Sequence, residues 1–310
     1  MKHEPFKLLP AFKDYLWGGT KLKTEFNKKT DLEKVAESWE LSTHKDGESV
    51  IATGENAGMS LAEYIKKYDV TGKRAEQFSF FPILIKFIDA KDNLSVQVHP
   101  DDEYSLKNNG EYGKTEMWYV LDAEEGASLY YGFNRELTKE EFKKRIEDNT
   151  LLEVLNKVPV KKGDVFFIKS GTVHAIGKGI MICEIQQNSN TTYRVYDYDR
   201  RDSKGNARPL HIEQAIEVST LAPAKEVEKL PPNVLASCEY FTVEKYDISG
   251  EFTLEITEDC FKSVIVLSGS GEMEYEGGNL QLEKGESIFI PAQNTKVKIK
   301  GNCEIIVSYV

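Results

Sequence analysis

At residues 95–102 the chain reads Ser95-Val96-Gln97-Val98-His99-Pro100-Asp101-Asp102, a strand-like run that ends in a proline and two acids. Successive side chains of a strand point to opposite faces, so Ser95, Gln97 and His99 are expected to share one face. Glu116 and His174 follow further along the chain. Together these residues suggest one mononuclear metal site.

Outside this run, most of the chain alternates or is apolar in short stretches bounded by Gly, Asn, Asp or Pro, which is typical of many short strands. Helical signals are few. Ser60 and Thr138 each resemble the start of a capping box, and short helices are expected near 150–157 and 211–218. The sequence therefore predicts a mainly β protein with a few short helices. We expect strands at 80–88, 116–121, 165–168, 179–186, 240–248, 262–267 and 288–290.

The end of the chain repeats a sequence pattern found in its middle. Residues 163–174 and 285–296 share a glycine-acid turn, an apolar strand and a second tight turn, but His174 falls opposite Lys296. The segment 221–232 is rich in Pro, Glu and Lys and indicates a linker. We therefore predict a metal-binding catalytic domain at 1–230, with a short helical insert near 137–158, and a degenerate domain at 231–310 without metal ligands.

Composition narrows the class of partner. Forty basic against fifty-one acidic residues give a net charge of −11, which argues against nucleic acid or an anionic membrane as a partner. No apolar run approaches eighteen residues and no signal peptide is evident, so we expect a cytoplasmic protein. The four cysteines form no CxxC pair, which argues against a zinc ribbon or a disulfide framework.

The candidate metal ligands are of three kinds. His99, His174 and Glu116 suit zinc with an open position for water or substrate, and Gln97 could add a neutral oxygen. Two histidines and a carboxylate also form the facial triad of iron oxygenases. The ligand types alone do not choose the metal.

Several motifs together resemble one family, the type I mannose-6-phosphate isomerases, in their compact bacterial form. The resemblance covers essentially the whole chain and is carried by residues 15–19, 36–42, 82–90, 94–102, Lys114-Thr115-Glu116 and the turn ending at His174. It implies two cupin-type (jelly-roll) β-barrels and one Zn²⁺ per chain. By the same resemblance, Gln97, His99, Glu116 and His174 match the zinc ligands of the family.

The resemblance also implies an aldose–ketose isomerase that interconverts mannose 6-phosphate and fructose 6-phosphate through a cis-enediol. Such chemistry needs a base and groups that stabilise negative charge on oxygen. Glu184 is the candidate base, Arg194 aligns with a catalytic arginine of the family, and Lys114 precedes a ligand position. Candidates for contact with the phosphosugar substrate are Lys86, Ser95, Trp17 and Arg200, although Trp17 also suits a core position.

Two other functions remain open at this stage. The first is an iron-dependent cupin oxygenase that uses His99, Glu116 and His174. The second is a non-catalytic sugar-binding cupin whose metal is structural. Metal analysis, oxygen consumption and isomerisation of mannose 6-phosphate distinguish the three.

Overall fold

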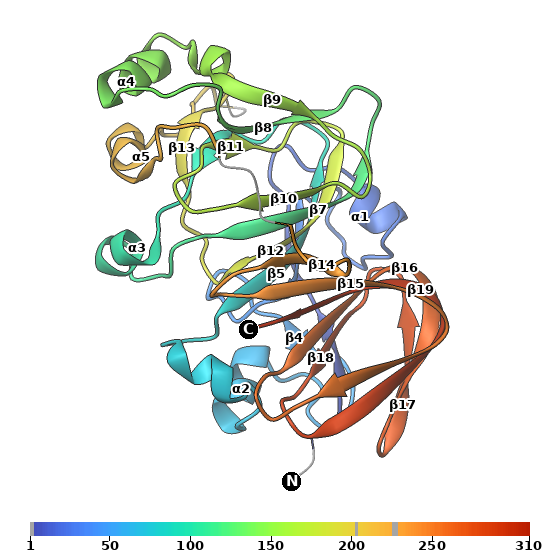
Figure 1. Cartoon of the computed structure of the whole chain (residues 1–310). Helices are drawn as coiled ribbons and strands as arrows, with labels where there is room; N and C mark the ends of the chain where they lie inside the picture. Colours follow the sequence, from blue (N-terminus) through green and yellow to red (C-terminus); the bar gives the residue numbers. More distant parts are fainter. Residues whose placement is uncertain (1–2, 202–203, 225–228) are drawn as a thin grey trace. The chain divides into compact units, whose positions relative to one another are not determined.

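The structure, a computed structural model, describes residues 3–201, 204–224 and 229–310 (Figure 1). Within these residues the chain is mainly β, with strands β1 to β19 and only short helices, as predicted. Contacts between residues divide the chain into two compact units. Unit 1 comprises Met1–Tyr15, Thr20–Phe87 and Lys229–Val310, and unit 2 comprises Leu16–Gly19 and Ile88–Glu228. The division falls within β5 (Ile83–Ala90).

Unit 1 contains an eight-stranded sheet in the order β14-β15-β19-β16-β18-β1-β4, with β17 paired to β16. Buried side chains on its strands form a core that includes Val264, Ile288 and Ile305. The strands are β1 (Phe6–Leu9), β4 (Val50–Ile51), β14 (Val234–Ser237), β15 (Thr242–Ile256), β16 (Lys262–Tyr275), β17 (Gly278–Glu283), β18 (Ser287–Ile290) and β19 (Thr295–Tyr309).

Two of these strands are much longer than predicted. The predicted strand at 262–267 covers only the buried, apolar beginning of β16, which continues through a polar segment to Tyr275. That second half stays extended because its backbone pairs with β17 on one side and β19 on the other. Strand β15 likewise pairs with β19 along all fifteen of its residues. Apolar patterning finds the buried part of such a strand and misses the part fixed by pairing.

The rest of unit 1 includes the paired strands β2 (Ala11–Lys13) and β3 (Glu37–Leu41). Its helices are α1 (Lys21–Thr24), α2 (Leu61–Lys67) and the 3₁₀ turn η1 (Lys73–Gln77). The capping box predicted at Ser60 is confirmed, since the Ser60 hydroxyl accepts from the Glu63 amide and the Glu63 carboxylate accepts from the Ser60 amide.

Unit 2 contains a five-stranded sheet in the order β13-β6-β11-β8-β9. Its strands are β6 (Val96–Val98), β8 (Ser128–Phe133), β9 (Leu155–Pro159), β11 (His174–Ala175) and β13 (Tyr193–Tyr196). A second group of antiparallel strands in this unit has β7 (Glu116–Ala123) between β10 (Val165–Ile168) and β12 (Ile180–Gln187). These two groups of strands carry the candidate metal ligands.

Three helices of unit 2 follow or cover its strands, namely α3 (Asp102–Asn108), α4 (Lys139–Glu147) and α5 (Ile212–Val218). Helices α4 and α5 lie side by side (Figure 1), and their buried residues belong to one core with Phe133 and Val195. The helix predicted at 211–218 is confirmed by α5. At Thr138 the hydroxyl caps α4, but the Glu141 side chain pairs with Arg135 instead of closing the predicted capping box.

The helix predicted at 150–157 is wrong. Only Leu151–Val154 forms a single 3₁₀ turn, η2, and the chain then enters β9. The reason is tertiary pairing: β9 pairs in antiparallel register with β8, from Ser128 opposite Pro159 to Phe133 opposite Leu155. A backbone engaged in a ladder cannot also make helical hydrogen bonds, so the local helical pattern is overridden.

The prediction of two β-barrels is not confirmed, because no sheet closes on itself within the described residues. The repeat seen in the sequence does have a structural counterpart. Gly163 and Gly285 have φ values of 90° and 89°, and each precedes a four-residue strand, β10 or β18. The middle of the predicted linker, residues 225–228, lies outside the described residues. None of the helices in the described part of the chain has the length and apolar character needed to cross a bilayer.

Candidate metal centre and active site

Strand register in unit 2 places three of the predicted site residues in one row. Strand β6 lies between β11 and β13, with Gln97 directly opposite His174 on one side and Arg194 on the other. Residues directly opposite each other in a ladder point to the same face of the sheet. The amide, the imidazole and the guanidinium are therefore neighbours on one face.

A second row comes from β7 and β12. Glu116 opens β7 opposite Gln186, and Trp118 lies opposite Glu184. Because side chains two residues apart share a face, Glu116, Trp118 and Glu184 project from the same side of these strands. The Trp118 indole lies 5.3 Å from the His174 ring, centroid to centroid, which joins this row to the first.

His99, Glu116 and His174 come together as one buried cluster. Their ligand atoms all lie within 4.8 Å of one another. The His174 Nε2 atom is 3.3 Å from Glu116 Oε1, and the His99 Nε2 atom is 3.7 Å from Glu116 Oε2. All three side chains are at most 1% exposed. Residues far apart in the sequence thus converge as the metal-site prediction required.

Main-chain carbonyls hold both imidazoles. The Nδ1 atom of His99 is 2.9 Å from the Thr191 carbonyl oxygen, and the Nδ1 atom of His174 is 2.9 Å from the Thr172 carbonyl oxygen. A carbonyl only accepts hydrogen bonds, so each Nδ1 carries the proton and each Nε2 presents its lone pair toward Glu116. Metal-binding histidines are oriented in this way.

Burial also keeps His174 neutral. Burial and, to a smaller extent, the nearby Lys114 lower the pKa of His174 to about 4, although the hydrogen bond to the Thr172 carbonyl and the charge of Glu184 act in the opposite direction. A neutral imidazole is the form that binds a metal. The donor set of two imidazole nitrogens and one carboxylate therefore fits a divalent ion such as zinc or iron.

Lys114 adds a cation to the cluster. Its ammonium lies 3.1 Å from Glu116 Oε2 and 3.1 Å from His99 Nε2, and its side chain is only 5% exposed. The ammonium balances the buried carboxylate. It also brings a proton donor to the ligand atoms.

Gln97 lies at the edge of the same cluster. Its Nε2 atom is 3.5 Å from His99 Nε2 and 3.4 Å from His174 Nε2. A half-turn of the side-chain amide exchanges its nitrogen and oxygen positions, which would present Oε1 to the same point as a neutral ligand. Gln97 is thus close enough to join the three residues.

Glu184 is a buried carboxylate on the face that carries Glu116. The Trp118 indole donates a hydrogen bond of 2.8 Å to Glu184 Oε1. Glu184 is 3% exposed and close enough to His174 to act on its pKa. A buried carboxylate near a metal-binding cluster has the chemistry of a general base.

Arg194 lies on the opposite side of Gln97 from His174. Its Nε atom donates to Ser95 Oγ at 3.2 Å, and its Nη1 atom donates to the Pro209 carbonyl oxygen at 3.1 Å. The predicted residues Ser95 and Arg194 are therefore in direct contact, with the hydroxyl holding one edge of the guanidinium.

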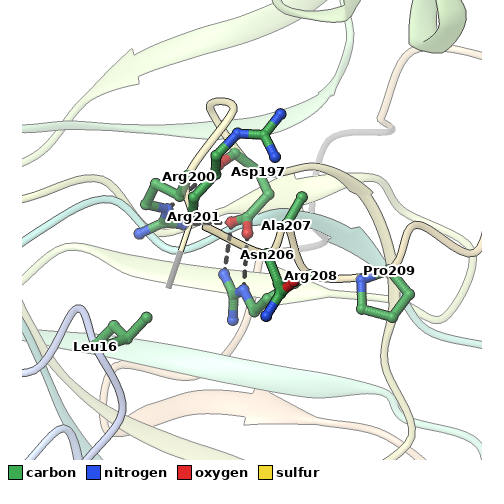
Figure 2. A pocket seen from close by; sticks show the side chains of 8 residues that line it. All are labelled: Leu16, Asp197, Arg200, Arg201, Asn206, Ala207, Arg208 and Pro209. Carbon is green, nitrogen blue, oxygen red and sulfur yellow. Dashed lines mark hydrogen bonds and ion pairs between the residues drawn. The ribbon is translucent and has the colours of Figure 1, made fainter. Parts of the chain in front are cut away.

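Arg200 lies in a separate cluster of unit 2. It donates to Asp197 Oδ1 at 2.6 Å and to the Asn93 carbonyl oxygen at 2.6 Å. Figure 2 shows Asp197 between Arg200 and Arg208, beside a cavity.

The other two predicted substrate contacts have structural partners of their own. In unit 1 the Lys86 ammonium lies 3.5 Å from Glu37 Oε2 and 4.8 Å from the centre of the Trp39 ring. Trp39 is fully buried. In unit 2 Trp17 is 5% exposed, and its carbonyl oxygen accepts a hydrogen bond from Asp92. The substrate roles of Lys86 and Trp17 stay predictions.

The sequence reasoning missed three features of the site. The first is the pair of carbonyl groups that hold the imidazoles, which no side-chain pattern encodes. The second is Trp118, the hydrogen-bond donor to Glu184; its position two residues after Glu116 on a strand was a usable signal. The third is Asp197, which binds two arginines and lies within the run of charged residues that follows Arg194.

Comparison with known proteins gives consistent matches. The family model of the phosphomannose isomerase type I catalytic domain matches residues 5–128, and that of the mannose-6-phosphate isomerase cupin domain matches residues 233–310. A mannose-6-phosphate isomerase of Streptococcus mutans is 42% identical over 99% of this chain and 98% of its own length. One from Bacillus subtilis is 39% identical over the full length of both chains. A crystal structure of the mannose 6-phosphate isomerase from Bacillus subtilis superimposes with a TM-score of 0.90 at 36% identity, covering 99% of this chain and 100% of that one.

Proposed function

The chain belongs to the type I phosphomannose isomerases and is a mannose-6-phosphate isomerase, and we propose that it works with one Zn²⁺ held by His99, Glu116 and His174. One observation carries the proposal. Two buried imidazoles, each with its Nδ1 atom held by a main-chain carbonyl, and one buried carboxylate meet within 4.8 Å. This donor set leaves room for substrate oxygens, and we propose Gln97 as an additional neutral ligand.

When bound, zinc supplies Lewis-acid polarisation of the substrate oxygens. We assign the proton transfer to Glu184. In the aldose-to-ketose direction its carboxylate removes the proton from C2, the C–H electron pair forms the C1–C2 double bond, and the carbonyl electron pair moves to O1, which takes up a proton. The resulting cis-enediol then loses the O2 proton and takes a proton from Glu184 at C1, which gives the ketose.

Two cations support these steps. The Lys114 ammonium, beside Glu116 and His99, is placed to donate a proton or hydrogen bond to the substrate oxygen on which negative charge develops. The Arg194 guanidinium, one strand from Gln97, provides positive charge for the same oxygen or for the phosphate. Ser95 holds Arg194 by a hydrogen bond to Nε. We further propose Lys86, Trp17 and Arg200 as contacts to the rest of the phosphosugar.

The same proposal includes the finer features inferred from the sequence. These are two cupin-type barrels, a catalytic domain at 1–230, a degenerate domain at 231–310 and a cytoplasmic location. The matched turns at Gly163 and Gly285 support the first of them.

The test combines metal content with isotope incorporation. Purified protein is analysed for metals and then incubated with mannose 6-phosphate in deuterated water. We expect about one zinc per chain, formation of fructose 6-phosphate and deuterium in the sugar. His99→Ala should lose the metal and the activity together.

Two outcomes would contradict the proposal. Iron as the bound metal together with oxygen consumption would favour the oxygenase function. Full isomerase activity in chelator-treated, metal-free protein would remove the role assigned to His99, Glu116 and His174.

A further inference from the structure

The short segment 113–115, which leads into strand β7, is held by hydrogen bonds that the proposed chemistry does not use. The Lys114 amide donates to the Pro100 carbonyl oxygen at 2.9 Å. A Cβ atom at Gly113 would lie only 2.4 Å from the main-chain carbonyl carbon of Asp101, which excludes a side chain at this position. The segment therefore runs directly along the residues that immediately precede α3.

Thr115 uses all of its polar groups in this arrangement. Its amide donates to Gln187 Oε1 at 2.8 Å, and its carbonyl oxygen accepts from the Gln187 amide at 3.1 Å. Its hydroxyl accepts from the Ser170 amide at 3.3 Å. Thr115 is 4% exposed and Gln187 is 2% exposed, and a buried main-chain group that loses its partner is costly. Thr115 therefore ties the segment that carries Lys114 to two other parts of unit 2.

Two partners of opposite kind fix the orientation of the Gln187 side-chain amide. A main-chain N–H only donates, so the atom that faces Thr115 is the oxygen. An ionised carboxylate only accepts, so the atom that faces Asp102 is the nitrogen. The Gln187 Nε2 atom donates to Asp102 Oδ1 at 2.8 Å, and the same oxygen accepts from the Gly113 amide at 2.7 Å. Asp102, in the first turn of α3, thus holds the segment both directly and through Gln187.

The loop that the Thr115 hydroxyl contacts is also bonded to both histidines. The Gly171 amide donates to the His99 carbonyl oxygen at 2.8 Å, and the carbonyl oxygen of the next residue, Thr172, holds Nδ1 of His174 at 2.9 Å. A displacement of Thr115 would therefore act on the carbonyl that orients His174, only two residues beyond the amide that the Thr115 hydroxyl accepts from.

We propose that Gln187 and Thr115 are positioning residues for the isomerase reaction. Gln187 fixes the main chain between Lys114 and Glu116. Asp102 sets the orientation of the Gln187 amide, and the Thr115 hydroxyl holds the loop that orients the second imidazole. The inference rests on the function proposed above, because it assigns the residues that hold the proposed proton donor and metal ligands in place.

Gln187→Glu is the most informative substitution, because positioning and charge predict opposite results. The new carboxylate can still accept from the Thr115 amide, but it opposes the Asp102 carboxylate where an N–H donor stood. If only charge mattered, an added negative charge close to the metal ligands would tighten zinc binding. Because Gln187 positions the segment, we expect the zinc affinity, measured by competition with a chelator, to fall by about 10- to 100-fold.

Kinetics at saturating zinc give a second readout. A displaced proton donor impairs the transition state more than the binding of the substrate. In Gln187→Glu we therefore expect kcat to fall by about 10- to 100-fold while KM for mannose 6-phosphate changes by less than about threefold. A role in stability alone would leave both constants of the folded protein unchanged.

A second substitution tests whether Gln187 and Asp102 act on each other. In the double variant Gln187→Glu/Asp102→Asn an amide and a carboxylate again face each other, and the net charge equals that of the wild type. We expect this double variant to recover part of both losses, so that the effects of the two single substitutions are not additive. Gln187→Met has a similar length but no hydrogen-bonding groups, and it should show losses like those of Gln187→Glu.

The Thr115 hydroxyl is tested separately. Thr115→Val removes the acceptor for the Ser170 amide and keeps the main-chain bonds to Gln187, so we expect the zinc affinity to fall by about three- to tenfold, the effect of one neutral hydrogen bond. Thr115→Ser keeps the hydroxyl and should retain the affinity. If Gln187→Glu fails to fold, the comparison of these two variants at Thr115 carries the test.

Two matched controls belong to the same unit. Thr138→Val removes a similar hydrogen bond, in which the hydroxyl accepts from the Glu141 amide at 3.1 Å; it should lower stability and leave zinc affinity and kcat unchanged. Gln214→Glu makes the same change of charge at an exposed glutamine of α5 and should leave both quantities unchanged.

Three results would each overturn the inference, namely unchanged or tighter zinc binding in Gln187→Glu, an unchanged kcat in that variant, and equal zinc affinities of Thr115→Val and Thr115→Ser. A wild-type protein that binds no zinc or does not isomerise mannose 6-phosphate would instead overturn the proposed function.

Discussion

Replacement of Lys114 by methionine should weaken turnover but tighten the binding of zinc. The Lys114 ammonium lies 3.1 Å from Glu116 Oε2, and the two side chains are 5% and 0% exposed. At an effective dielectric constant of about 20, two unit charges at this distance attract by about 5 kcal/mol. Removal of one partner from a buried pair typically costs about 3–5 kcal/mol, because the remaining charge has lost its partner.

That cost falls mainly on the metal-free protein. In the zinc-bound form the positive ion neutralises Glu116, so the loss of Lys114 is smaller there. If the bound form loses about 2 kcal/mol less than the free form, zinc should bind roughly 30-fold more tightly, because every 1.4 kcal/mol is a factor of ten. The same substitution removes the proposed proton donor, so kcat should fall.

Three measurements check this reasoning. Chemical unfolding of the metal-free protein gives the loss of stability, competition with a chelator gives the zinc affinity, and a coupled assay gives kcat. Lys178→Met, an exposed lysine of the same unit, is the control. Weaker zinc binding in Lys114→Met, or an unchanged stability of the metal-free protein, would refute the assigned role of Lys114.

Four further outcomes are expected. Glu184→Gln should keep zinc but lose deuterium exchange into the sugar, because the amide cannot accept the C2 proton; retained exchange would assign the base elsewhere. Arg194→Ala should likewise keep zinc while turnover falls, and a metal loss reversed by excess zinc would argue against its role. The Glu111 carboxylate accepts hydrogen bonds from the Asn190 amide and the Thr191 hydroxyl, beside the Thr191 carbonyl that holds His99. Glu111→Ala should therefore weaken zinc binding by about 10- to 100-fold. Glu103→Ala is the control, and equal zinc affinities of the two variants would count against this role of Glu111. Finally, the pKa of His174 is about 4 in the folded protein, against 6.5 in the unfolded chain, so the unfolded state binds the proton first as the pH falls. The metal-free protein should therefore lose about 3 kcal/mol of stability between pH 6.5 and pH 4. Denaturant titrations at several pH values measure this loss, and His174→Asn should lack it.

Sequence reasoning identified the residues of the metal cluster, because the alternation of side chains along a strand and the types of ligand can both be read from the sequence. His99, Glu116 and His174 do meet in space. The sequence could not predict the secondary structure that depends on pairing between distant strands. The segment at 150–157 has a helical pattern but pairs with β8, and β16 extends beyond its apolar half because two neighbours hold it.

The charged residues were predicted unevenly for a related reason. Arg194 and Arg200 were identified as cations, but the sequence does not reveal that Asp197 links Arg200 to Arg208. Similarly, Lys114 was assigned to catalysis from its place next to a ligand strand, whereas its ion pair with Glu116 needs coordinates. A linear pattern gives the type of a side chain, and its partner depends on how the backbone folds.

The two carbonyl groups that hold the imidazoles have a consequence for how the chain tolerates mutation. Because the acceptors are the backbone oxygens of Thr172 and Thr191, substitution of either threonine side chain leaves the acceptor in place. Insertion or deletion of one residue in these loops would move the acceptor and turn the ring. The orientation of the ligands is therefore robust to changes of residue type at these two positions and sensitive to changes of loop length.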